Sequence, residues 1–145
     1  MDTKEIEQML NEDLLQWARL CAVLESHPNQ SLHAPEDPEW TSRDVYAHLA
    51  RWMELSTKQL TAQLEGRTSP IEDGTDDEIN ARWQTEDRVL RLDQARSWAQ
   101  RAFDERVLSI QAVPSDRWTP PLERTARGDG SHHYASHRES IVLAR

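Results

Sequence analysis

Apolar residues along this chain recur at steps of three and four, and this spacing limits the fold more than any other feature of the sequence. In the first segment, residues 1–26, the repeating positions are Ile6, Met9, Leu10, Leu14, Trp17, Cys21 and Leu24. Such spacing places side chains on one face of an α-helix, whereas a strand would alternate them with a period of two. Alternating runs of Val, Ile and Thr bounded by turn residues are missing. The sequence therefore predicts an all-α protein.

Helix-breaking and capping residues divide the chain further. Three prolines predict a loop over residues 27–39, because proline has no backbone N–H and resists the helix interior. Thr41 and Asp44 have the three-residue spacing of a capping box, and the same spacing recurs at Thr75. Ser131 is expected to cap the last helix. We expect the helices near residues 2–26, 42–65, 75–112 and 131–145.

The connections between these helices indicate how they assemble. The third helix is expected to kink or break near residues 91–93, because Asp93 could cap a fresh helix there. Two glycines and a proline in residues 65–74 predict a loop that crosses one end of the bundle, and residues 113–130 are expected to form the last loop. The expected architecture is a single domain, residues 1–145, folded as a four-helix bundle with one long crossover connection.

The charge and the cysteine content exclude several classes of function. The chain has 17 Lys and Arg against 26 Asp and Glu, and the formal net charge of −9 would repel nucleic-acid phosphates and anionic membrane surfaces. We expect no nucleic-acid partner and no membrane partner. The single cysteine, Cys21, cannot form an internal disulfide and is expected to be buried and chemically inert. With no apolar run long enough for a membrane span or a signal peptide, we expect a cytoplasmic protein.

Three of the six histidines stand together in the stretch SHHYASHRESI, residues 131–141. His133 and His137 are four residues apart, so on a helix they share one face, with Cβ atoms about 5–6 Å apart, and can chelate one metal ion. His132 points about 100° away from His133 and is not expected to join them. A pair with this spacing is a weak signal by itself, and a solvated helix face is the alternative interpretation.

A third ligand could come from His48, which lies on the inward stripe of the second expected helix. Its neighbours on that stripe include Val45, Leu49 and Trp52. An imidazole among such residues needs partners for its ring nitrogens, and a metal ion would be one. The alternative is a core histidine whose nitrogens bond a backbone carbonyl or water. The residues alone leave both interpretations open.

Two motifs resemble those of the DinB/YfiT-like superfamily. The stretch WTSRDVYAHLARW (40–52) resembles the D-V-x-x-H-L-x-x-W element of its second helix, and HYASHRESI (133–141) resembles the H-x-x-x-H-R-G-Q-I element of its last helix. The stretch TDDEINARW (75–83) is most similar to the branch that includes the ClbS/DfsB proteins and the thiol-dependent maleylpyruvate isomerases. The resemblance implies a divalent metal ion, zinc or nickel first, held by three histidines that fall here on His48, His133 and His137.

The resemblance leaves the reaction type open, because Glu139 and Ser140 replace the Gly-Gln that the superfamily has after His-Arg. One hypothesis is a metal-dependent hydrolase or thiol-dependent transferase, acting on a small molecule in detoxification or stress resistance, with a low-molecular-weight thiol as partner. A second is a non-catalytic protein that binds a small ligand or a metal. A third is an interaction bundle in the form of a homodimer. A solvent-open cavity beside the histidines would favour the first two hypotheses.

Other polar and aromatic side chains are candidates for the wall of such a cavity. Each also has an ordinary structural interpretation as a cap, a core residue or a surface residue. Arg138, next to His137, is expected to make a surface or inter-helix ion pair rather than a catalytic contact. The candidate wall residues are Asn80, Asp77, Trp83, Tyr46 and Tyr134.

Overall fold

The computed structural model describes residues 1–28 and 40–143 of the chain. Over these ranges all regular structure is helical and no strand occurs, so the expected all-α fold is confirmed. The greater part of the expected loop over residues 27–39 lies outside the described residues. The described helices are α1 (Thr3–Ser26), α2 (Ser42–Leu64), α3 (Asp76–Asp87), α4 (Leu92–Gln111), α5 (Pro120–Gly128) and α6 (Ser131–Leu143).

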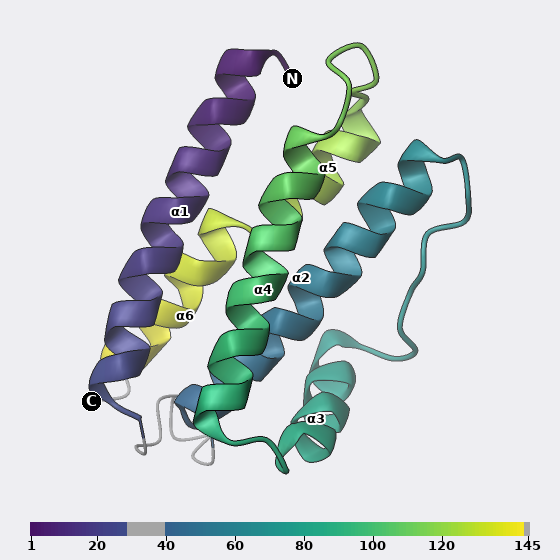
Figure 1. The fold of residues 1–145 in the computed structure, drawn as a ribbon. Helices are drawn as coiled ribbons and strands as arrows, with labels where there is room; N and C mark the ends of the chain where they lie inside the picture. The colour runs from purple at the N-terminus through teal and green to yellow at the C-terminus, as the bar shows by residue number, and fades with distance from the viewer. Residues whose placement is uncertain (29–39, 144–145) are drawn as a thin grey trace.

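Four of these helices, α1, α2, α4 and α6, form the bundle (Figure 1). The most extensive packing joins α2 to α4 and α1 to α6. In Figure 1, α2 and α4 run in one direction and α1 and α6 in the other. Because α2 and α4 are parallel, the chain between them must travel back along the bundle. Residues 65–91, which include α3, make this return and form a long crossover connection. The loop over residues 65–74, which was expected to cross one end of the bundle, instead runs back along it.

The expected break in the third helix is present, but its cap is a different residue. Helix α3 ends at Asp87, and α4 begins at Leu92 with Arg91 in the N-cap position. The Gln94 side chain accepts a hydrogen bond from the Arg91 N–H at 2.8 Å. Asp93 therefore lies in the first helical turn rather than at the cap, and its carboxylate pairs with the Arg91 guanidinium at 3.1 Å.

The last expected loop, residues 113–130, was predicted incorrectly in part, because it contains the nine-residue helix α5. Thr119 is its N-cap and accepts a hydrogen bond from the Leu122 N–H, while prolines occupy the first helical positions, where no N–H donor is needed. Leu122 and Ala126 then bury one face of this short helix. Ser131 is the first residue of α6 and not its cap.

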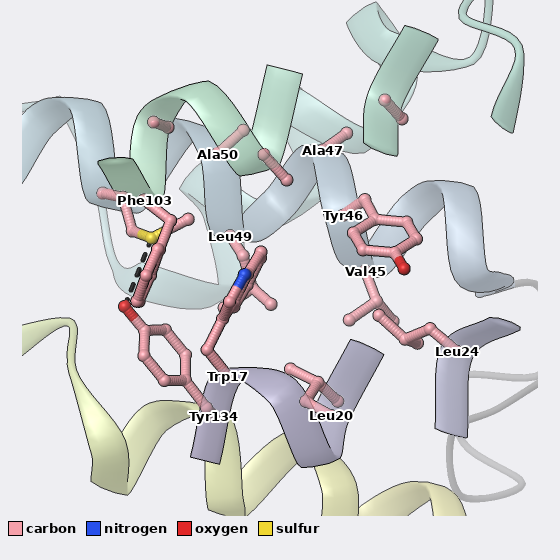
Figure 2. Close-up of a cluster of buried hydrophobic side chains, with 14 of the residues drawn as sticks. Trp17, Leu20, Leu24, Val45, Tyr46, Ala47, Leu49, Ala50, Phe103 and Tyr134 are labelled. Carbon is pink, nitrogen blue, oxygen red and sulfur yellow. Dashed lines mark hydrogen bonds between the residues drawn. The ribbon is translucent and has the colours of Figure 1, made fainter. Parts of the chain in front are cut away.

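A cluster of aromatic side chains joins the four helices of the bundle (Figure 2). Trp17 of α1 stacks on Phe103 of α4, with ring centroids 5.1 Å apart, and meets Tyr134 of α6 edge-on at 5.3 Å. The Tyr134 hydroxyl donates to the Met53 sulfur of α2 at 3.3 Å. Side chains from all four bundle helices thus meet in one place. Packing of this kind fixes how each helix is rotated about its own axis.

The buried face of α1 differs from the expected stripe. Leu14 is 56% exposed, whereas Leu20 is fully buried. Asp13 takes an inward position on this helix and is 1% exposed. A carboxylate is stable there because it pairs with a buried arginine of α4, Arg106. The simple apolar pattern could not show that pair.

Cys21 was expected to be buried, but it is only partly so. It packs at the margin of the aromatic and aliphatic core rather than inside it. Removal of the thiol from water still raises its pKa to about 11. Its chemical inertness thus remains a prediction that the raised pKa supports.

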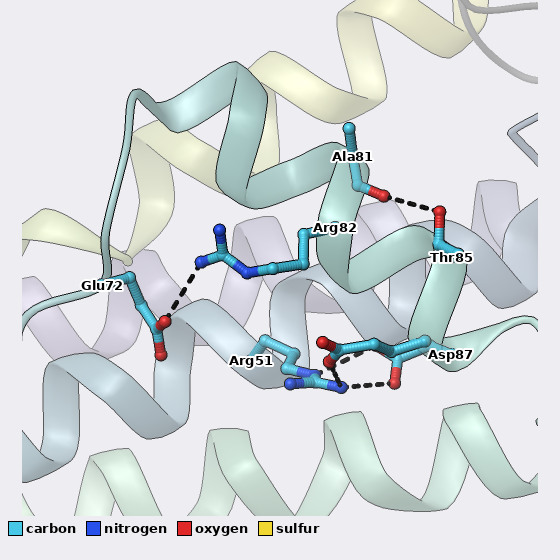
Figure 3. Close-up of polar contacts among 7 residues, drawn as sticks. Arg51, Glu72, Ala81, Arg82, Thr85 and Asp87 are labelled. Atoms are coloured by element: carbon cyan, nitrogen blue, oxygen red, sulfur yellow. Dashed lines mark hydrogen bonds and ion pairs between the residues drawn. The ribbon is translucent and has the colours of Figure 1, made fainter.

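The crossover is tied to α2 by polar contacts (Figure 3). Arg51 of α2 holds the Asp87 carboxylate at the end of α3 with two hydrogen bonds, of 3.1 and 2.7 Å. Arg82 of α3 bonds Glu72 in the preceding loop at 3.2 Å. The Arg51–Asp87 pair keeps α3 against the side of α2 that carries His48, whereas the Arg82–Glu72 pair joins α3 to its own preceding loop. Within the described residues, no helix is both long and apolar enough to cross a membrane.

Candidate metal centre

Helices α2 and α6 bring three histidines to one point. His48 is carried by α2 between the fully buried Val45 and Leu49, and it is 8% exposed. His133 and His137 lie one helical turn apart on α6 and are partly exposed. The helix α2 begins where the sequence predicts, because the Asp44 carboxylate accepts a hydrogen bond from the Thr41 N–H at 2.9 Å. This start sets the register that turns His48 inward.

The three imidazoles face one another through their Nε2 atoms. The His48 and His133 Nε2 atoms are 3.3 Å apart, and those of His137 and His133 are 3.1 Å apart. One possible ligand atom from each of the three residues lies within 4.8 Å of the others. The ring centroids of His48 and His137 are 4.8 Å apart, so the third side of the triangle is also short. His132 is exposed and stands at the rim.

Asp129 lies behind His133, in a position that the sequence analysis did not single out. One of its carboxylate oxygens is 3.3 Å from the His133 Nδ1 atom. The contact does not have hydrogen-bond geometry, but the nearby negative charge favours the tautomer with the proton on Nδ1, which leaves a lone pair on Nε2. Asp129 precedes His133 by four residues, and this is the same spacing that marked His133 and His137.

A buried ion pair fixes the position at which α6 begins. It therefore also fixes where His133 and His137 lie along the bundle axis. Arg106 of α4 donates to the Asp13 carboxylate at 2.8 Å and also bonds the Ala126 carbonyl at the end of α5. The other Asp13 oxygen accepts from the Ser131 N–H at 2.8 Å. Gly130 lies against this pair, and a Cβ atom there would be 2.6 Å from Asp13 Oδ1 and 2.8 Å from Arg106 Nη2. Only glycine fits without displacing the pair.

A cavity of about 600 Å³ opens beside the three histidines. Trp40 and Trp52 form part of its wall, with Asp76 and Asn80 from α3 and Asp129 and Ser136 from the α6 side. The Trp52 indole N–H donates to the Asn80 side-chain oxygen at 2.8 Å, which holds both groups in place. The site thus combines three convergent imidazole nitrogens with a space that could take a small molecule.

The other candidate wall residues have mixed outcomes. Asn80 lines the cavity as expected. Asp77 does not line it, and the preceding residue, Asp76, lines it instead. Trp83 lies behind Trp52, with ring centroids 4.9 Å apart. Tyr46 and Tyr134 belong to the hydrophobic core and are at most 1% exposed.

The inter-helix contact expected of Arg138 is present, but no ion pair of Arg138 occurs among the described residues. Arg138 makes an inter-helix contact with a neutral partner, the Gln16 amide oxygen of α1, at 3.2 Å.

The sequence was compared with known families and proteins. Residues 14–139 match the mycothiol maleylpyruvate isomerase N-terminal domain. The chain belongs to this family. This family is a member of the DinB/YfiT-like superfamily, so the match confirms the resemblance found in the two histidine motifs. No curated protein and no solved structure gave a match in the same comparisons.

For this member of the mycothiol maleylpyruvate isomerase N-terminal domain family, the matched region covers the whole candidate centre. It begins within α1, one residue after Asp13, and ends within α6, two residues after His137. All three histidines and the six wall residues named above fall inside it.

Proposed function

We propose that this protein is a divalent-metal-dependent enzyme acting on a small molecule, with His48, His133 and His137 as the metal ligands. The observation that carries the proposal is the convergence of their Nε2 atoms. Two nitrogens bound to a tetrahedral zinc ion at about 2.0–2.1 Å stand about 3.3–3.4 Å apart. The Nε2 separations of 3.1 and 3.3 Å are close to that value. Neutral imidazoles suit zinc or nickel, and these are the ions we propose.

The residues around the histidines support a site that works on a substrate. Three protein ligands leave a coordination position open, as catalytic zinc sites do. All three histidines line the cavity, and its volume of about 600 Å³ falls in the range of small-molecule sites. A cavity in this place argues against the interaction bundle with no ligand.

We further propose that the reaction depends on a low-molecular-weight thiol. The name of the matching family joins a thiol to an isomerisation, and this supports thiol chemistry over simple hydrolysis. A divalent metal ion in such a site lowers the pKa of a bound thiol or water. The chain's own groups would position the substrate: the indoles of Trp40 and Trp52 shield it from water, while Asn80 and Ser136 offer polar contacts.

Cobalt(II) substitution tests the proposed function directly. Cobalt-loaded protein should develop a sulfur-to-cobalt charge-transfer band in the near ultraviolet when 2-mercaptoethanol is added, because the thiolate takes the open position. His137→Ala should lose the cobalt and the band, whereas His132→Ala should keep both. Bound cobalt that gives no such band would show a site closed to thiols and would remove the thiol-dependent reaction.

A further inference from the structure

We propose that the cavity selects a substrate whose body is flat and either neutral or positively charged, and that it disfavours a substrate with two negative groups. This inference rests on the proposed function in one respect, since it takes the cavity beside the histidines as the substrate site. It goes further by naming the substrate class from the charges and aromatic faces of the wall.

The wall of the cavity carries negative charge and no arginine or lysine among the described residues. Asp76 and Asp129 are its charged groups, apart from the histidines. The Asp76 carboxylate stands in the first turn of α3, and Asp129 directly precedes Gly130 and α6. Helix N-termini attract anions, but the N-termini of α3 and α6 already have the Asp76 and Asp129 carboxylates beside them. They therefore offer little to an anionic substrate.

Two arginines on the helices that carry Trp52 and Asp76 have carboxylate partners, whereas Arg138, next to His137, bonds the neutral Gln16 of α1. Arg51 is bound by Asp87 and Glu86, at 2.7 and 2.9 Å. Arg82 is bound by Glu72, as Figure 3 shows. The net charge of −9 adds a negative field, which draws cations toward the protein and repels anions.

Two tryptophans give the wall its flat apolar surface. Trp40 packs edge-on against His48, with ring centroids 5.1 Å apart. Trp52 is held by its hydrogen bond to Asn80 and by contact with Trp83. Indole faces attract cations, and their attraction is strongest where the cation is removed from water. Because these rings are already held in place, they lose little conformational entropy when a flat ligand binds.

A metal ion at the histidines would change the charge preference of the cavity only at the metal itself. Its positive charge would accept one anionic donor atom, such as a thiolate sulfur. A second anionic group on the same ligand would have to lie beyond the metal, among the carboxylates and indoles of the wall. Repulsion there would be weakened by solvent but not reversed. The wall is thus suited to one negative group at most.

Three benzyl compounds of similar shape test the proposal on the full chain: benzyltrimethylammonium, neutral benzyl methyl sulfone and benzylsulfonate. Each is titrated into metal-free and zinc-loaded protein by calorimetry, and metal content is measured on the same samples. The ammonium should bind about fivefold or more tightly than the sulfonate, with the sulfone between them. The order should hold in metal-free protein, whereas zinc should tighten the sulfonate most, because the metal ion accepts one anionic group.

Matched variants separate the wall from the overall charge of the protein. Asp76→Asn should reduce the ammonium-to-sulfonate ratio about twofold or more, because the lost carboxylate lines the cavity. Asp77→Asn makes the same change one residue along the first turn of α3, outside the wall, and should leave the ratio unchanged. Trp52→Leu should weaken the ammonium more than the sulfonate.

Three results would overturn the inference. The first is sulfonate binding as tight as ammonium binding in metal-free protein. The second is no detectable binding of any of the three compounds at millimolar concentration. The third is an equal loss of preference in Asp76→Asn and Asp77→Asn, which would assign the effect to the overall charge. Absence of bound zinc would contradict the proposed function instead, and the ranking in metal-free protein would still decide this inference.

Discussion

A single residue step separates His132 from His133, and the two imidazoles have different surroundings. His133 contacts His48 and His137, whereas His132 is exposed at the rim of the cavity. Successive residues on a helix point about 100° apart, so only one of two neighbours can face the same partner. The distinction was predicted from the sequence for this reason. It makes His132 a natural control for every experiment on the centre.

Asp129→Asn should lower the zinc affinity about tenfold or more without unfolding the protein. A neutral amide in place of the carboxylate stabilises the tautomer protonated on Nδ1 less well and makes the His133 Nε2 a weaker ligand, and carboxylates that contact a ligating histidine change metal affinity about 10–100-fold. A competitive titration with a chromophoric chelator measures the change. Asp116→Asn removes an equal charge from the exposed loop before α5 and serves as the control. Wild-type affinity in Asp129→Asn would contradict this role.

Cys21 should react slowly with thiol reagents in the folded protein. Burial raises its pKa to about 11, so at pH 8 only about 0.1% is thiolate, and the reaction should be about a hundredfold or more slower than that of a free cysteine. The rate should rise as the pH approaches the pKa. Absorbance after addition of a disulfide reagent, in native buffer and in denaturant, measures both rates. Native and denatured rates within tenfold of each other would count against a protected thiol.

At the scale of elements, the junction of α5 and α6 depends on Gly130. Gly130→Ala should destabilise the protein by about 1–3 kcal/mol, because the new Cβ would meet Asp13 and Arg106 at less than 3 Å. Gly128→Ala, two residues earlier, meets no atom within 4 Å and should change stability little. Urea unfolding of the two variants compares them directly. Equal stability would show that the buried pair adjusts freely.

The sequence predicted the starts of the helices better than the short elements. Capping boxes at Thr41 and Thr75 are local and lie where expected. The break before α4 was also predicted, but its cap was assigned to Asp93 because aspartate is the commoner N-cap residue. Helix α5 was missed, since its apolar face is only two buried residues wide. Asp13 was missed because its burial depends on Arg106, 93 positions away.

At the scale of the whole molecule, topology decides which side chains share the centre. Helices α2 and α6 are far apart in sequence, and the pairing of His48 with His133 follows from how the bundle closes. The two histidine motifs predicted that meeting through the family resemblance. The acidic and aromatic wall could not be predicted in the same way. Asp76 reaches it only because the crossover lays α3 against α2.

The central claim, a metal ion held by three histidines, is tested most directly by the metal content of purified protein. Wild-type protein supplied with zinc should retain one ion per chain. His48→Ala, His133→Ala and His137→Ala should each lose most of it, because two imidazoles alone make a weak site, while His132→Ala should retain it. Equal metal in all four variants, or no uptake by the wild-type protein, would contradict the claim.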